Sequence, residues 1–114
     1  MKPAPFAYFA PTRVEEAVDL LAAHADEAKV LAGGQSLVPL MNMRLVKPAV
    51  LVDINRVAAL DYIRWEDGSL AVGAITRQRA LERAPEVAVR VPIIRETLYY
   101  LGHAQIRNRG TIGG

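Results

Sequence analysis

The apolar run at residues 49–54 constrains the fold of this chain more than any other segment. It is rich in β-branched residues and has no polar alternation, which is typical of a strand buried on both faces. Such strands belong mainly to parallel sheets, whose crossover connections contain helices. An amphipathic helix is predicted at 13–24, and further strands at 6–9 and 29–32. We therefore expect a βαβ-like beginning with parallel pairing, in which 6–9 lies at an edge between two prolines.

The second half of the chain shows a different pattern. Two short strand-like runs flank Asp67-Gly68, a two-residue hairpin signal because both residues tolerate positive φ. A helix is predicted at about 77–84, ended by Pro85, and Pro92 is expected to begin the last helix, with Gly102 after its end. The mixture of crossover and hairpin elements predicts an α+β fold.

Three helix starts carry capping signals. Thr12 and Glu15 fit a capping box, in which two side chains satisfy free amides of the first turn. Ser36 and Thr76 are predicted to be the N-caps of the helices that follow them.

Composition limits the class of protein. The chain has 114 residues, of which 52% are hydrophobic and 23% charged, so it is long enough to bury the core of one soluble globular domain. It has no cysteine, and a disulfide, a thiolate zinc site or an iron–sulfur cluster cannot be built from it alone. We recognise neither a membrane-length apolar run nor a signal peptide, and we expect a cytoplasmic protein.

The net charge of +2 is concentrated near the end of the sequence. After Glu96 the only charged residues are Arg107 and Arg109, which lie beside a glycine-rich segment. A local positive spot suits a small anion such as phosphate better than a nucleic-acid duplex, which calls for a broad basic face. The alternative is that this segment is simply solvated.

The first glycine-rich segment follows a predicted strand. Gly33 and Gly34 lack Cβ atoms, so the backbone can approach a ligand closely, and the start of the helix after Ser36 adds partial positive charge. This arrangement could hold a phosphate group, although a tight turn explains Gly33-Gly34 equally well. Neither the Rossmann Gly-x-Gly-x-x-Gly pattern nor the Walker pattern occurs, which argues against nicotinamide binding and P-loop hydrolysis.

The segment 105–114 repeats the same chemistry. It combines glycines, the hydroxyl of Thr111 and two nearby arginines. Two such loops could hold one pyrophosphate from two sides, which neither could do alone. An ordinary hinge or turn is the alternative.

Four segments together resemble one known family, the FAD-binding medium subunits of molybdenum hydroxylases, which include the carbon monoxide dehydrogenase and xanthine dehydrogenase families. They are Ala32-Gly33-Gly34-Gln35-Ser36-Leu37, Leu51-Val52-Asp53-Ile54-Asn55, Val72-Gly73-Ala74 and the whole of 102–114. The resemblance implies an FAD-binding domain of the vanillyl-alcohol-oxidase type, also called PCMH-type. The chain would be an N-terminal fragment, with a first lobe at about 1–60 and the start of a second lobe at about 61–114.

The resemblance also implies which residues bind the cofactor. FAD would be contacted by Ala32, Gly33, Gly34, Gln35, Ser36, Leu101, Thr111, Ile112, Gly113 and Gly114. In such enzymes a large subunit oxidises the substrate at a molybdopterin centre, and a small subunit with two [2Fe–2S] clusters passes the electrons to this FAD. No residue of this chain is assigned a catalytic or metal-binding role. His24 is expected to make a dipole or solvent contact at a helix end, and His103 a structural hydrogen bond.

Two other functions remain open at the level of sequence. One is a freestanding FAD-dependent oxidoreductase of the same fold. The other is a non-catalytic interaction module that does not bind flavin. We expect the 114 residues alone to bind FAD weakly or not at all.

Overall fold

A computed structural model describes residues 1–114, and a three-stranded parallel sheet forms its first half. The strands are β1 (Ala7–Phe9), β2 (Ala28–Leu31) and β3 (Val50–Asp53), in the order β1-β3-β2. Ala7 and Ala28 both pair with Val50. The predicted central strand, its parallel neighbours and the edge position of the first strand are therefore confirmed.

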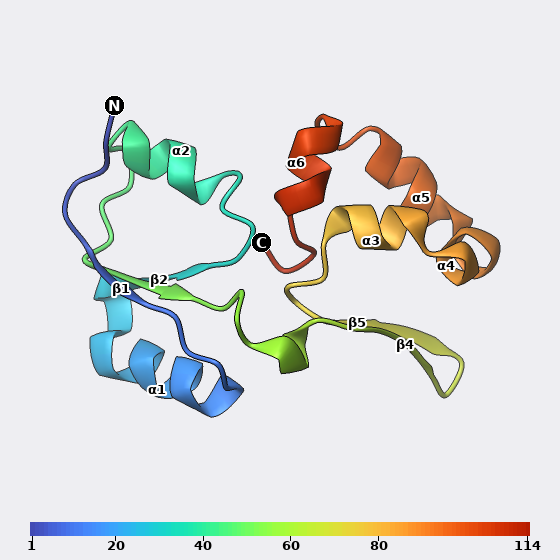
Figure 1. Ribbon diagram of the computed structural model, residues 1–114, viewed down its shortest axis with the longest axis horizontal. Helices are drawn as coiled ribbons and strands as arrows, with labels where there is room; N and C mark the ends of the chain where they lie inside the picture. Colours follow the sequence, from blue (N-terminus) through green and yellow to red (C-terminus); the bar gives the residue numbers. More distant parts are fainter.

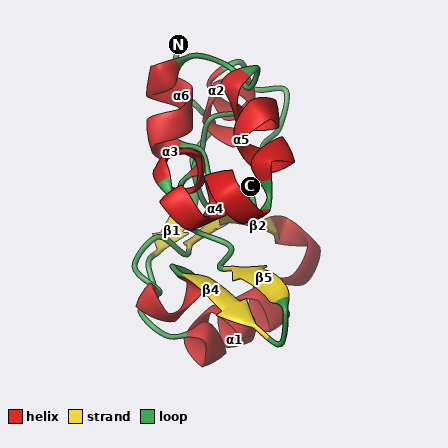
Figure 2. Ribbon diagram, turned by 90° about the vertical axis from the view of Figure 1, so that its right-hand side faces the viewer, coloured by secondary structure: helices red, strands yellow, loops and turns green.

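Helices lie on both sides of this sheet. Helix α1 (Val14–His24) continues into the 3-10 turn η1 (Ala25–Glu27) and packs on β2 and β3. Helix α2 (Leu37–Asn42) lies on the opposite side (Figures 1 and 2). This layering explains why the central strand has no polar alternation, because side chains of both faces are covered.

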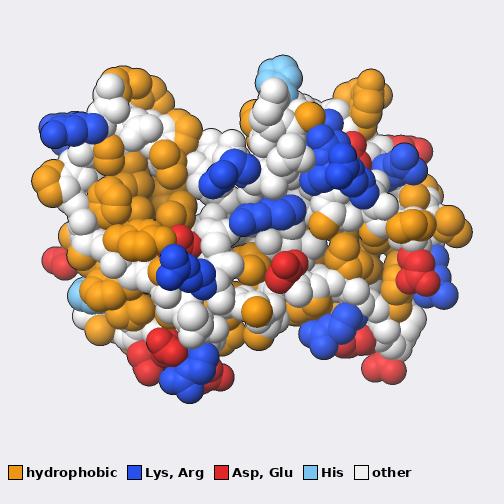
Figure 3. Space-filling view, in the orientation of Figure 1, with side chains coloured by type: hydrophobic (Ala, Val, Ile, Leu, Met, Phe, Trp, Pro, Cys, Tyr) orange, Lys and Arg blue, Asp and Glu red, His pale blue; other side chains and the backbone are white.

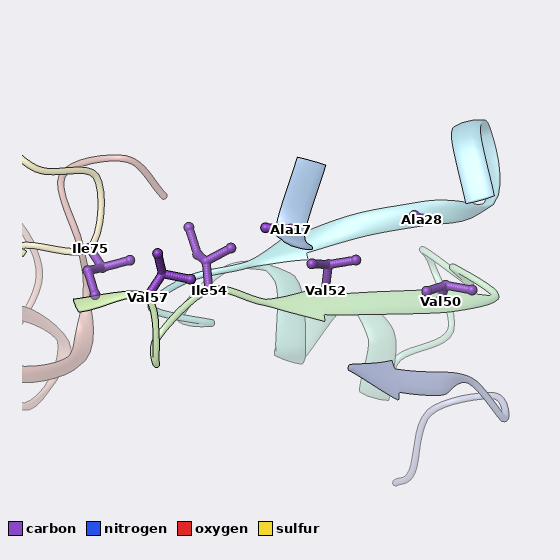
Figure 4. Packing of buried hydrophobic residues seen from close by; sticks show 7 residues of the cluster. All are labelled: Ala17, Ala28, Val50, Val52, Ile54, Val57 and Ile75. Carbon is purple, nitrogen blue, oxygen red and sulfur yellow. The ribbon is translucent and has the colours of Figure 1, made fainter. Parts of the chain in front are cut away.

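The main hydrophobic core lies between α1 and the sheet. Val50 and Val52 point from β3 toward Ala17 of α1, and the cluster continues along the chain after β3 (Figure 4). Its buried members are Ala17, Ala28, Val50, Val52, Ile54, Val57 and Ile75. Leu51 is also buried and, by the alternation of a strand, faces the α2 side.

The second half begins with the 3-10 turn η2 (Ala58–Leu60) and the hairpin of β4 (Ile63–Glu66) and β5 (Ser69–Val72). Asp67 and Gly68 have φ values of 49° and 77°, so the predicted two-residue turn is confirmed. Four helices follow and pack over the hairpin (Figure 1). They are α3 (Gln78–Arg83), α4 (Pro85–Arg90), α5 (Pro92–Tyr99) and α6 (Ala104–Arg109).

A second hydrophobic cluster holds these helices together. Leu81, Val87 and Leu98 are buried, one from each of α3, α4 and α5, and hairpin residues pack against them. The predicted lobe boundary near residue 60 stays a prediction. Ile75 belongs to the first cluster although it follows the hairpin, so the chain returns to the first core after leaving it.

The predicted capping box at the start of α1 is wrong. The helix begins at Val14 after Arg13, and no side chain bonds to its free amides. Arg13 instead pairs with Glu16 at 2.8 Å. Thr12 and Glu15 therefore do not form the predicted pair of capping hydrogen bonds. Ser36 does precede α2 as predicted, but its hydroxyl makes no capping bond.

The predicted cap at Thr76 is also wrong. Arg77 precedes α3, while the Thr76 hydroxyl accepts a bond from the Tyr62 N–H at 3.2 Å and donates to the Tyr62 carbonyl at 2.9 Å. Thr76 is 1% exposed, so these bonds satisfy a hydroxyl inside the protein. Helices α4 and α6 were not predicted, because each is a single short segment without apolar periodicity.

Candidate functional site

The two glycine-rich segments meet in the structure. We call residues 32–36, after β2, the first glycine loop and residues 110–114, after α6, the second glycine loop. The end of the chain lies between the two halves of the molecule in Figure 1. The second glycine loop is fixed by an antiparallel bridge between Thr111 and Arg77, and the Gly113 N–H donates to the Ala74 carbonyl at 2.8 Å.

The closest approach of the loops is at Gly33. A Cβ atom there would lie 2.7 Å from the Arg109 carbonyl oxygen and 3.0 Å from the Thr111 nitrogen. Only glycine lets the loops come this close without displacement. The next residue, Gly34, has a φ of 75°, a conformation that also favours glycine.

A cavity of about 370 Å³ lies between the loops. Every residue for which we predict cofactor contact lines it except Ile112, which is 45% exposed. Leu101, at the end of α5, is therefore brought to the same cavity as both loops. The remaining lining residues are Val30, Leu37, Gln78, Gly102, Ile106 and Gly110. Their role as FAD contacts stays a prediction.

Two buried polar atoms at this cavity have no hydrogen-bond partner. They are the hydroxyl of Thr111 and the amide oxygen of Gln78, and both residues line the cavity. Buried polar atoms in folded proteins are nearly always paired, so these two atoms lack the partner that a bound polar group or water would supply. The Thr111 hydroxyl could donate to a phosphate oxygen, whereas the Gln78 oxygen can only accept and would need a donor group. Gln78 carries no sequence signal for a place at this cavity and was missed.

Arg107 does not offer its charge to the cavity. Its side chain is 11% exposed, pairs with Glu82 at 3.0 Å, and donates to the carbonyls of Leu101 and Gly102. The hypothesis that both arginines near the second loop attract a phosphate is thus wrong for Arg107. Arg109 lines a second hollow on the other side of the first glycine loop. Lys and Arg side chains gather around the middle of this face in Figure 3.

Asp53 forms the turn that follows β3. Its carboxylate accepts bonds from the Asn55 backbone at 2.9 Å and from the Tyr8 hydroxyl, so the turn role favoured over ribose binding is confirmed. Burial works to raise the pKa of Asp53, but these bonds and the charge of Arg56 outweigh it and hold that pKa below its ordinary value. The same contact with Asp53 raises the pKa of Tyr8.

The histidines lie away from the cavity lining. The ring of His24 stacks on Phe9 with centroids 5.6 Å apart, and His103 is exposed just before α6. No three His, Cys, Asp or Glu side chains are grouped so as to hold a metal ion. None of the helices is both long enough and apolar enough to cross a membrane.

Comparison with known proteins identifies the family. Residues 4–114 match the model of the FAD binding domain in molybdopterin dehydrogenase. The chain belongs to this family of FAD-binding domains. The predicted family, the α+β fold class and FAD as the cofactor are thereby confirmed.

Individual relatives agree over the whole chain. It is 50% identical to the 6-hydroxypseudooxynicotine dehydrogenase complex subunit alpha of Paenarthrobacter nicotinovorans, in an alignment that covers 100% of this chain and 38% of that protein. It is 45% identical to the carbon monoxide dehydrogenase medium chain of Hydrogenophaga pseudoflava, over 100% of this chain and 40% of that protein. The solved structure of reconstituted CO dehydrogenase from Oligotropha carboxidovorans superposes with a TM-score of 0.98 at 43% identity, over 100% of this chain and 40% of that one. The chain thus spans about 40% of the length of these relatives.

Proposed function

We propose that this chain is the first part of the FAD-binding electron-transfer subunit of a molybdenum hydroxylase. When bound, FAD would receive electrons from [2Fe–2S] clusters on a small partner subunit and pass them to an acceptor such as NAD, a quinone or oxygen. Oxidation of the substrate would take place at a molybdopterin centre on a large partner subunit. These partners are proposed from the family and from the names of the relatives.

One observation carries the proposal for this chain's own residues. The two glycine loops, at 32–36 and 110–114, line one cavity, and the hydroxyl of Thr111, a lining residue, is buried without a partner. A ligand with a pyrophosphate group could accept hydrogen bonds from that hydroxyl and from the amides of both loops at the same time. An accidental surface hollow would give no reason for a buried, unpaired donor.

The residues of the chain bind and orient the cofactor. Gly33 lets the first loop pack against the backbone of the second, Gly34 lines the same cavity, and Thr111 supplies a hydroxyl from the opposite loop. Leu101 and Ile106 provide apolar surface beside these polar groups. This combination of a mostly preformed cavity with a few polar groups is usual for cofactor sites.

The experiment is to express the full-length subunit together with the neighbouring reading frames and to measure its flavin, iron and molybdenum content. We expect stoichiometric FAD in the subunit and co-purification of a molybdopterin subunit and a [2Fe–2S] subunit. Addition of the substrate of the complex should then bleach the flavin absorbance.

Three results would count against this proposal in different ways. A folded full-length subunit without flavin, and without affinity for added FAD, would favour an interaction module. Stoichiometric FAD in a subunit that is active without partners would favour a freestanding oxidoreductase. Flavin that stays oxidised while the molybdenum centre turns over would contradict the electron-transfer role.

A further inference from the structure

Asn55 and Arg77 together connect the first glycine loop to Arg109, the residue directly before the second. The Asn55 side-chain nitrogen donates to the Ala32 carbonyl of the first loop at 2.7 Å. The Asn55 side-chain oxygen accepts from Nη2 of Arg77 at 2.8 Å, and Nη1 of Arg77 donates to the carbonyl of Arg109, directly before the second loop, at 3.0 Å. A continuous chain of three hydrogen bonds therefore joins one loop to the other.

The orientation of the Asn55 amide is fixed by its neighbours. Its nitrogen also donates to the Asp53 carboxylate at 2.6 Å, so the nitrogen faces two acceptors and the oxygen faces a guanidinium. The flipped amide would place its oxygen against a carbonyl and a carboxylate, and its nitrogen against a cation. Only one orientation satisfies every group, and it is the one that joins Ala32 to Arg77.

Arg77 is suited to the other end of the bridge because of its shape. The planar guanidinium presents two nitrogens in a fixed geometry, and here each serves a different acceptor. The backbone of Arg77 also pairs with Thr111 of the second loop. Its side chain and main chain thus fix the same loop at two points.

The bridge also determines which groups the first loop offers to a ligand. The Ala32 carbonyl is turned toward Asn55, and in a trans peptide the next N–H, that of Gly33, points the opposite way. The Gly33 N–H has no hydrogen-bond partner, and Gly33 lines the cavity. Neither Asn55 nor Arg77 lines that cavity, so they act on a ligand there through the loops they hold, although Asn55 lines the second hollow beside the first loop.

We propose that Asn55 and Arg77 are positioning residues that set the distance between the two glycine loops and thereby the affinity for the pyrophosphate of FAD. This inference rests on the proposed function. Without the bridge the loops keep their own sequence and their glycines, but they are no longer held at the spacing at which both reach one ligand. Part of the binding free energy is then used to bring them together.

The test uses the full-length subunit stripped of flavin and titrated with FAD, with bound flavin followed by fluorescence. We expect Arg77→Gln and Asn55→Ala each to raise the Kd about ten-fold or more, as the loss of a charge-assisted hydrogen bond would do. The double variant should be little worse than either single variant, because each change alone breaks the same bridge. Arg77→Lys should recover part of the affinity, since it keeps the charge and one bond. Arg13→Gln removes an arginine from an exposed pair and serves as the control.

The outcomes separate the two proposals. If the wild-type subunit is folded and does not bind FAD, the proposed function fails. If the wild type binds FAD and the Arg77 and Asn55 variants bind within about two-fold of it, the positioning role is overturned while the function stands. Losses of affinity that simply add in the double variant would also overturn it. Thermal unfolding of each apoprotein identifies a variant that fails to fold, in which case Arg77→Lys carries the test.

Discussion

Replacement of Gly33 by alanine tests the contact between the two loops most directly. The added Cβ would lie 2.7 Å from the Arg109 carbonyl oxygen, whereas ordinary contact begins at 3.4 Å, so the loops must separate by about 0.7 Å (3.4 − 2.7). The nearest atoms belong to the backbone, and the Arg109 carbonyl is itself held by Arg77. No flexible side chain can move aside to relieve this clash.

The expected effect follows from the cost of overpacking. Forcing extra atoms into a packed site costs about 1–3 kcal/mol. The free protein relieves this strain when the loops move apart, and FAD has to close them again against it. We therefore expect the Kd for FAD to rise by about 5-fold to 150-fold, at 1.4 kcal/mol for each factor of ten.

The assay compares Gly33→Ala with Gly68→Ala in the full-length subunit. Gly68 lies in the hairpin turn with a φ of 77° and has no atom within 4 Å of an added Cβ, so alanine there strains the backbone without a clash. This control should lose about 1 kcal/mol of unfolding free energy and keep its affinity for FAD. If Gly33→Ala binds FAD as tightly as the wild type, or if Gly68→Ala weakens binding equally, the assigned loop contact is wrong.

Three further predictions concern other parts of the site. Thr111→Val removes a buried unpaired hydroxyl, so thermal unfolding of the apoprotein should occur at an equal or higher temperature, while FAD titration shows an affinity about five-fold to ten-fold lower. Arg107→Gln breaks a mostly buried pair with Glu82, which keeps its second pair with Arg79, and should lower the unfolding free energy in urea by about 2 kcal/mol. Weaker FAD binding at unchanged stability would show that this arginine contacts the ligand instead. Folding lowers the pKa of Asp53, so the stability that its ionised carboxylate contributes is present above the ordinary pKa and is lost as the pH falls through the lowered pKa. Folding raises the pKa of Tyr8, so the stability that its protonated hydroxyl contributes is lost as the pH rises above 10.0. The difference in unfolding free energy between wild type and Tyr8→Phe should therefore be greatest near neutral pH and shrink at both extremes, and a difference independent of pH would contradict the assignment.

The strands and the hairpin could be predicted from sequence because their signals are local. The run at 49–54 has one physical solution, a strand covered on both sides, and Asp67-Gly68 has a backbone preference of its own. The helix caps were predicted less well, since a threonine hydroxyl has many possible partners. Thr76 is the clearest case: its bonds to Tyr62 depend on a turn that only the folded chain brings near.

The glycines of the candidate site could be predicted from the sequence, but the residues that contact the two loops from elsewhere in the chain could not. Gly33 and Thr111 belong to recognisable segments, and the structure brings them to one cavity. Asn55 belongs to a segment that resembles the family, but neither that segment nor the sequence around Gln78 and Arg77 indicates their contacts with residues far away in the chain. Their positions follow from tertiary packing, which a pattern in one segment does not contain.

The arginines near the second glycine loop show why charge position alone is a poor guide to a phosphate ligand. Arg107 is adjacent to the loop in sequence, yet its charge is already engaged by Glu82, which also pairs with Arg79, and it does not line the cavity. Arg77 is distant in sequence and bonds only to uncharged oxygens, yet it holds the loop in place. We therefore propose that anion binding at this cavity relies on backbone amides and one hydroxyl, which carry no net charge to be neutralised. Because those amides come from two separate loops, they can bind one ligand together only at a suitable spacing between the loops. In our proposal that spacing is set by Asn55 and Arg77, which lie outside the cavity lining.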